Sequence, residues 1–362
     1  MFQAPGFVGE VMSDADDDPM GGLAGDVRRS LHRFLDIYEP LRPDLYRYCR
    51  YLTRSPWDAE DLAQDAMARA FVTLGRMGQP PPNPRAWLFR VASNLWIDAT
   101  RRPGFTAPAA PAGDAAAETW QEPRDTREAG GTLLSRLAPQ ERAAVMLKDV
   151  FDLKVEEIAE TFSTSVGAVN AALHRARGRL AESALEADDA QGAASATVAD
   201  RGPRRLPTPG VLDAFCQAFN ARDLPRLTSL LLDTAAVEVV GTMTGQGRDI
   251  ATKSILQGML FGSERLAHAD TQGGIDPVYM RGVLSDSPRA EVRPYRGEPV
   301  MLLWYMHQDV EAVRAINRVD THGDQVAGVQ NYFFSPDFLA DVCTELGVPF
   351  RVNGYRFWLT GC

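Results

Sequence analysis

Cysteine is scarce in this chain: only four occur in 362 residues, and they are widely scattered. Cys49, Cys216, Cys343 and Cys362 form no Cys-x-x-Cys pair. This speaks against both a zinc site and a disulfide framework. The chain therefore suits a reducing cytoplasm, and nothing in its sequence points to a metal or another cofactor.

Long hydrophobic runs are also missing. No apolar stretch approaches the roughly 20 residues that span a bilayer, so no membrane partner is expected. Residues 1–22 lack the basic segment followed by an apolar one that marks a secretory signal.

Positive charge is in deficit, with 38 Lys and Arg against 48 Asp and Glu, a net charge of −10. Charge-driven binding to DNA depends on Lys and Arg at the phosphates. Any DNA-binding role must therefore be local or assisted by a partner. The content of 45% hydrophobic and 24% charged residues fits a globular protein, and the length indicates two or three domains.

What the chain does contain is a helix-turn-helix pattern at residues 133–182. Pro139 suits the first position of a helix, and 155–162 form a second, short helix. Ser165 is a good N-cap for a third helix over 165–181. The buried stripe of that third helix comprises Val166, Val169, Leu173, Ala176 and Leu180.

The opposite face of the helix at 165–181 is polar and basic, with Gly167, Asn170, Ala171, His174, Arg175, Arg177 and Arg179. A short helix, a tight turn and a long helix with a basic face are typical of a recognition helix in a DNA major groove. The alternative is an ordinary helical hairpin whose basic face is only solvated.

A second unusual helix is predicted at 85–102. Trp87, Phe89 and Trp96 exceed what one buried face needs, and basic residues such as Arg90 alternate with them. Rings that stack on bases, next to arginines that hold phosphates, suit single-stranded nucleic acid. The alternative is that the aromatic rings fill the core of a small helical domain.

Upstream, residues 27–55 predict a helix that is broken near Pro40 or Pro43. Asp58 is expected to cap the next helix, 58–77, whose first half is acidic. Acidic residues there also suit the helix dipole, so the acidity alone does not define a binding face.

The predicted organisation is multidomain. It comprises a disordered tail (1–26), an all-α domain (27–102), a linker (103–131), an all-α helix-turn-helix domain (132–183), a second linker (184–207), an α+β domain (208–330) and an aromatic tail (331–362). In the α+β domain, a helix is expected from 211 to 224 with an interruption near 221–223, a second short helix at 227–231 and another at 250–260. Strands are expected at 236–240, 289–295, 300–305, 310–318 and 325–333.

Three stretches, DAEDLAQDAMARAF (58–71), NPRAWLFRVASNLWIDATRR (83–102) and LAPQERAAVMLKDVFDLKVEEIAETFSTSVGAVNAALHRARGRL (137–180), resemble the extracytoplasmic-function group of sigma factors in the sigma-70 family. The resemblance covers about half the chain, in matching order and spacing. It implies core RNA polymerase and promoter DNA as partners. Polymerase would supply most of the non-specific attraction to DNA, so the acidic charge is no contradiction.

The resemblance also implies roles for particular residues. The face toward polymerase would comprise Asp58, Glu60, Asp61, Gln64 and Asp65. The side chains near the minus-ten strand would be Arg90, Asn94, Trp96, Asp98, Arg101 and Arg102. Those facing the minus-thirty-five duplex would be Ser165, Gly167, Asn170, Ala171, His174 and Arg175.

One departure from the family pattern stands out. The family usually carries Lys and Arg where this chain has Asn170 and Ala172. The loss of two cations predicts weaker phosphate contact, although Asn170 retains the ability to read an adenine edge.

The stretch AFNARDLPRLTSLLLDTAAVEVVG (218–241) resembles the SnoaL-like branch of the nuclear-transport-factor fold, a cone-shaped sheet around a cavity. In sigma factors this resemblance implies regulation in cis. Three roles stay open for the domain: catalysis, a small-molecule ligand, or contact with other protein domains. The candidate acid–base residues Glu238, Arg248, His268, His307 and Asp320 have no spacing that fixes a pair, so no enzyme is predicted.

The aromatic tail predicts a helix built from Phe333, Phe334, Phe338, Leu339, Val342 and Leu346. We expect it to dock on one of the two sigma domains, so that deletion of 331–362 changes promoter output. The main rival function is a helix-turn-helix regulator that works without core polymerase, with a ligand-binding or enzymatic C-terminal domain. The aromatic helix at 85–102 speaks against this rival, because a reader of duplex DNA needs no strand-melting element.

Overall fold

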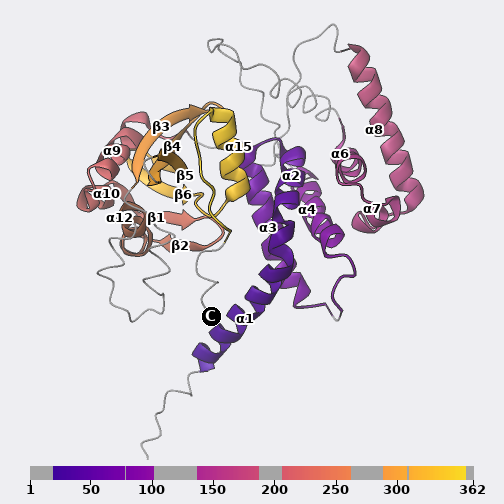
Figure 1. The fold of residues 1–362 in the computed structure, drawn as a ribbon, viewed down its shortest axis with the longest axis horizontal. Helices are drawn as coiled ribbons and strands as arrows, with labels where there is room; N and C mark the ends of the chain where they lie inside the picture. Colours follow the sequence, from indigo (N-terminus) through magenta and orange to yellow (C-terminus); the bar gives the residue numbers. More distant parts are fainter. Residues whose placement is uncertain are drawn as a thin grey trace, which may run out of the picture.

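A computed structural model describes residues 19–77, 79–101, 137–186, 206–261, 288–307 and 310–355. Both predicted linkers lie largely outside the described residues, as do Arg102 and His268. The described chain forms an N-terminal helical domain (19–101), a helix-turn-helix domain (137–186) and a C-terminal domain (206–355) (Figure 1).

The N-terminal helical domain consists of α1 (Pro19–Tyr38), a 3₁₀ turn (Glu39–Leu41), α2 (Arg42–Thr53), α3 (Pro56–Leu74) and α4 (Pro84–Arg101). The predicted break near Pro40 and Pro43 is confirmed, since the 3₁₀ turn separates α1 from α2. The predicted disorder over residues 19–26 is wrong, because α1 already begins at Pro19.

The start of α3 also differs from the prediction. Ser55, not Asp58, is the N-cap, and its hydroxyl accepts a hydrogen bond from the backbone N–H of Asp58 at 3.3 Å. Pro56 occupies the first helical position, where its missing N–H leaves no bond unmade.

The helix-turn-helix domain comprises α6 (Pro139–Val145), a wide π-helical turn (Met146–Val150), α7 (Val155–Thr161) and α8 (Val166–Glu186). Pro139 begins α6, as predicted. The cap at Ser165 is confirmed, because its hydroxyl accepts from the N–H of Ala168 at 3.2 Å.

The C-terminal domain begins with α9 (Pro209–Asn220) and α10 (Leu224–Leu230), followed by β1 (Leu231–Val239) and β2 (Met243–Gln246). A helical stretch follows, made of α11 (Arg248–Ala251), a π-helical turn (Thr252–Leu256) and α12 (Gln257–Phe261). The remaining strands are β3 (Arg289–Tyr295), β4 (Glu298–His307), β5 (Val310–His322) and β6 (Gln325–Asn331), and α15 (Pro336–Leu346) ends the domain. The sequence missed β2, which is short and mostly exposed.

The six strands form one sheet in the order β2-β1-β6-β5-β4-β3, parallel only between β1 and β6. Successive residues of β4 point to opposite faces. Met301 and Leu303 join a core with α9 and α12, whereas Leu302 and Trp304 join a core with α15 and the N-terminal helical domain. The sheet is therefore covered on both faces, and α15 lies between the sheet and α2 and α3 (Figure 1).

The segment after β6 is part of the C-terminal domain, so the predicted domain end at residue 330 is wrong. The backbone of Val313 in β5 donates to Pro349 and accepts from Arg351, each at 2.9 Å. The predicted tail helix exists as α15, but it begins at Pro336 and leaves Phe333 and Phe334 in the core on the α9 side of the sheet. Among the described helices, none has the length and apolar character to cross a membrane.

Candidate nucleic-acid and polymerase interfaces

The outer face of α8 carries the side chains expected to read duplex DNA. Ser165, Gly167, Asn170, Ala171, His174 and Arg175 are all exposed. Val169, Leu173 and Ala176 turn inward and pack on the rest of the helix-turn-helix domain. α8 lies at the edge of the molecule farthest from the sheet (Figure 1), and these side chains are exposed among the residues that the structure describes.

Ala172 belongs to the inner face, with only 7% of its surface exposed. The inward orientation of Ala172 speaks against a phosphate-contacting position there, and the lost cation at 172 stays a prediction. Asn170 is exposed, so the predicted effect of a missing cation on phosphate contact concerns mainly this position of α8.

The arginines of α8 are paired with carboxylates of the preceding segment. Glu141 of α6 accepts from Arg175 at 3.1 Å and from Arg179 at 2.6 Å. On the other flank, Arg177 pairs with Asp149 at 2.6 Å. Sequence reasoning missed Glu141, although its place two residues after the N-terminal Pro139 marks it as a capping residue, and it accepts from the N–H of Ala138 at 3.2 Å.

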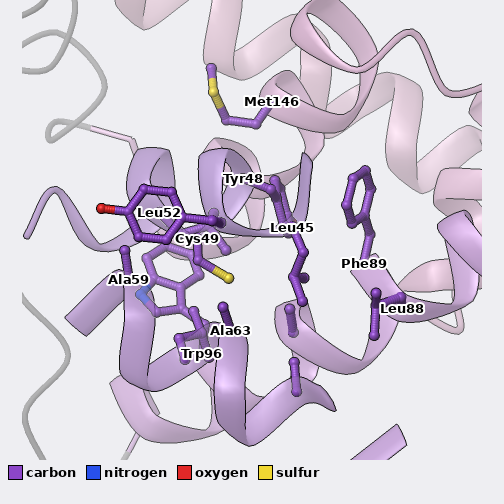
Figure 2. Packing of buried hydrophobic residues seen from close by; sticks show 14 of the residues in the cluster. Leu45, Tyr48, Cys49, Leu52, Ala59, Ala63, Leu88, Phe89, Trp96 and Met146 are labelled. Atoms are coloured by element: carbon purple, nitrogen blue, oxygen red, sulfur yellow. The ribbon is translucent and has the colours of Figure 1, made fainter. Parts of the chain in front are cut away.

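In α4 the residues predicted to lie near the minus-ten strand divide between two faces. Asn94 and Asp98 are exposed, and Arg90 is half-buried beside them. Trp96 faces the other way and is 2% exposed. Figure 2 shows Trp96 among Leu52 and Cys49 of α2 and Ala59 and Ala63 of α3. In this arrangement Trp96 and Phe89 fill the core, the alternative that the sequence left open.

Arg142 of α6 covers Trp96. Its guanidinium lies 5.3 Å from the centre of the Trp96 ring and donates to the carbonyl of Leu52 at 2.9 Å. Burial, with a smaller contribution from the charge of Arg54, lowers the pKa of Arg142 to about 10. It remains charged near neutral pH, so a cation–π contact joins the two domains.

Polar contacts at the edge of α4 add to this interface. Arg90 donates to the Ser163 hydroxyl at 2.7 Å, and Asn83 donates to Glu157 at 2.8 Å. Ser163 has φ 51° in the turn before α8, a left-handed conformation that costs a non-glycine residue energy. One face of α4 is thus held against the helix-turn-helix domain, while Asn94 and Asp98 stay open.

The predicted polymerase face of α3 is only partly exposed. Asp65 is exposed, and Asp58, Asp61 and Gln64 are half-buried. Glu60 is 1% exposed and forms an ion pair with Arg42 of α2. The interpretation of Glu60 as an outward-facing residue is therefore wrong, since its carboxylate is buried between α2 and α3 with Arg42 and Gln64 as partners.

The C-terminal domain reaches this same helix. Gly241 has φ 75°, and a Cβ at this position would lie 3.0 Å from the side-chain oxygen of Gln64. Tyr355 stacks on Arg42 at 4.8 Å, and its hydroxyl donates to Asp337. Burial raises the pKa of Asp337 despite the hydrogen bond from Tyr355.

Trp57 of α3 is the largest side chain at this interface. Its ring lies 4.7 Å from Phe338, 5.2 Å from Tyr332 and 6.2 Å from Tyr295, all in the C-terminal domain. The guanidinium of Arg318 covers the same ring at 4.6 Å. Trp57 therefore fills an aromatic box built by the sheet and α15.

A charged rim surrounds the box. Arg50 of α2 pairs with Asp341 at 2.7 Å and with Glu345 at 3.1 Å, and Tyr46 donates to Asp341 at 3.0 Å. Burial alone would raise the pKa of Glu345. The hydrogen bond and charge of Arg296 outweigh it, so the pKa lies below its usual value.

Two candidate acid–base residues of the C-terminal domain, Arg248 and Glu238, contact other groups rather than each other. Arg248 donates to the Leu231 carbonyl at 2.9 and 2.6 Å, and Glu238 accepts weakly from Gln330 at 3.5 Å. The described residues also hold no cluster of three or more potential metal ligands. The side chain of His307 and all of His268 lie outside the described residues.

Comparison with known families gives two matches. Residues 37–106 match Sigma-70 region 2, and residues 131–180 match Sigma-70, region 4. The first range contains α2, α3 and α4, and the second contains α6, α7 and most of α8.

Relatives of the chain are also sigma factors, in agreement with the two family matches. The chain is 31% identical over 231 residues to the ECF RNA polymerase sigma factor SigG of Mycobacterium tuberculosis, a match that covers 56% of this chain and 60% of SigG. It is 30% identical over 178 residues to SigD of the same species, covering 46% of this chain and 82% of SigD. SigW of Bacillus subtilis is 28% identical over 162 residues, covering 41% and 86%.

Two solved structures match the chain at low overall similarity. The M. tuberculosis sigma factor SigJ has 22% identity and a TM-score of 0.30, covering 84% of this chain and 98% of that one. An NTF2-like protein of Cytophaga hutchinsonii has 8% identity and a TM-score of 0.23, covering 35% and 90%. The six-stranded sheet with α9 to α12 on one face and α15 on the other is an α+β domain, the class that the sequence predicts. The chain thus belongs to the extracytoplasmic-function (ECF) RNA polymerase sigma factors of the sigma-70 family.

Proposed function

We propose that this chain is a sigma subunit that directs core RNA polymerase to promoters in the cytoplasm and is regulated in cis by its C-terminal domain. The observation that supports it most is the pair of helices suited to promoter contact on one chain. The outer face of α8 is polar and exposed, and α4 exposes Asn94 and Asp98. Two separate contacts with promoter DNA, one by α8 and one by α4, suit a protein that binds DNA as part of a complex with polymerase.

Regulation in cis is supported by how the C-terminal domain covers α3. The aromatic box holds Trp57, Gly241 approaches Gln64, and Glu60 is buried. Polymerase would bind the same helix through residues such as Asp65. We infer that the C-terminal domain and polymerase compete for α3, and that release of the domain raises the affinity for polymerase.

The C-terminal domain then acts by contact with its own chain rather than by catalysis. Its contacts with α2 and α3 support this role, and two of its acid–base candidates, Arg248 and Glu238, contact other groups rather than each other. The small-molecule ligand stays a prediction from the sequence. A thermal-shift screen of the full chain with a metabolite library tests it.

The decisive experiment is in vitro transcription with purified full chain, core polymerase and a library of genomic fragments. We expect run-off transcripts from a defined set of fragments that share two spaced sequence elements. If the chain directs no initiation, and core polymerase does not bind it, the function is not that of a sigma subunit.

A further inference from the structure

The three arginines of α8 fall on two different flanks of the helix. Arg175 and Arg179 are one turn apart and share a flank, whereas Arg177 lies on the other side of the exposed face, about 200° around the helix from Arg175. All three side chains are roughly half exposed: 57% for Arg175, 46% for Arg179 and 56% for Arg177. Between the flanks lie small or neutral residues, Gly167, Ala171 and Gly178.

The two flanks differ in net charge. Arg175 and Arg179 share the single carboxylate of Glu141, so two positive charges meet one negative charge and +1 remains. Arg177 and Asp149 form a one-to-one pair and leave no net charge. Phosphates are attracted by uncompensated cations, so the Arg175–Arg179 flank attracts the DNA backbone and the Arg177 flank does not.

Glu141 is also fixed more firmly than Asp149. Its side chain is 6% exposed and is held by the N–H of Ala138 at 3.2 Å, whereas the side chain of Asp149 is 39% exposed. A buried carboxylate with two bound guanidinium groups restricts their rotamers before DNA arrives. Such preorganisation reduces the entropy lost on binding.

We propose that Glu141 is a positioning residue that holds Arg175 and Arg179 toward the phosphates of one DNA strand, so that α8 enters the groove with this flank against the backbone. The inference rests on the proposed function in that it gives α8 a DNA duplex as its partner. It adds which flank carries the phosphate contact, and it identifies a residue that sets this contact without touching DNA.

The first test compares two arginines that are matched in exposure. Full-length protein with Arg179→Ala or Arg177→Ala is titrated onto a fluorescent, mixed-sequence DNA duplex at several salt concentrations. We expect Arg179→Ala to reduce the slope of log affinity against log salt by about 1 and Arg177→Ala to leave it unchanged. Equal loss of slope in both variants, or a wild-type chain that shows no salt-dependent binding, overturns the proposal.

The second test uses Glu141→Gln, with Asp149→Asn as its matched control. We expect Glu141→Gln to free a positive charge, steepen the salt slope by about 1 and strengthen binding to mixed-sequence DNA. Binding is also measured on promoter fragments from the transcription experiment, with the minus-thirty-five element intact or scrambled. In Glu141→Gln, the ratio of the two affinities should fall about tenfold, which corresponds to the loss of one well-placed contact.

If Glu141→Gln weakens binding to every sequence in parallel with a lowered Tm, Glu141 is only a structural link and the proposal fails. The comparison of Arg179 with Arg177 stands even if the Glu141 variant does not fold, because both arginines are exposed. Transcription by the wild-type chain decides the proposed function separately. A chain that initiates transcription normally but shows equal arginine effects refutes the positioning role alone.

Discussion

Glu60 and Asp65 lie five residues apart on α3, and the sequence assigns both to the polymerase face. In the structure Glu60 is buried in an ion pair with Arg42, whereas Asp65 is exposed. Removing one partner of a buried pair leaves an uncompensated charge in the interior. We expect Glu60→Ala to lower the free energy of unfolding by about 3 kcal/mol in a denaturant titration.

Asp65→Ala is the control for this experiment. It should change the free energy of unfolding by less than about 0.5 kcal/mol and weaken the affinity for core polymerase. If Glu60→Ala is instead as stable as the wild type and binds polymerase less well, Glu60 makes the contact that the sequence predicted.

Trp96 provides a second prediction at the scale of the residue. Because it is fully buried against α2, α3 and Arg142, Trp96→Ala should lower the free energy of unfolding by about 3–5 kcal/mol. Asn94→Ala, on the exposed face of the same helix, should preserve stability and impair promoter opening, as measured by permanganate reactivity of unpaired thymines. A stable Trp96→Ala protein with defective opening would restore Trp96 to the strand-melting role.

At the scale of the element, amphipathic spacing located most helices and strands. The stripe of α8 follows from its own sequence except at Val166, which the spacing predicts to be buried and which is 40% exposed. The sequence also predicts strands such as β3, whose predicted range of 289–295 equals the observed one. The sequence did not allow a prediction of which side chains of α3 and α4 are exposed to solvent. Their exposure depends on Arg142, Arg42 and the C-terminal domain, which are 18 or more residues away along the chain, and local periodicity carries no information on such partners.

The contact between α3 and α15 gives the prediction at this scale. Trp57→Ala removes the side chain that fills the aromatic box of Tyr295, Tyr332 and Phe338. Buried aromatic anchors dominate interface energies, so we expect the C-terminal domain to separate from α3. Small-angle scattering should show a larger radius of gyration, and limited proteolysis should release the C-terminal domain faster. Tyr51→Ala, an exposed aromatic of α2, is the control and should behave as the wild type.

At the scale of the whole molecule, the same contact links the fold to transcription. Deletion of residues 331–362 is a poor test of the docking hypothesis, because residues 349 and 351 pair with β5 and their loss would disrupt the C-terminal domain itself. A charge reversal at the rim is cleaner. Arg50→Glu places a negative charge against Asp341 and Glu345, where Arg50 now makes ion pairs at 2.7 and 3.1 Å.

We expect Arg50→Glu to open the interface, raise the affinity for core polymerase and increase promoter output in vitro. Like charges that face each other repel, and a separated C-terminal domain leaves α3 free for polymerase. Adding Asp341→Arg to this variant recreates an opposite-charge pair in reversed order. The double variant should therefore return toward wild-type output, because the rescue depends on the contact and not on either residue alone.

Should Arg50→Glu lower output while the double variant restores it, the interface regulates in the opposite sense and the docked state is the active one. Unchanged output in both variants, with the interface shown to be open by scattering, would remove the C-terminal domain from control of initiation.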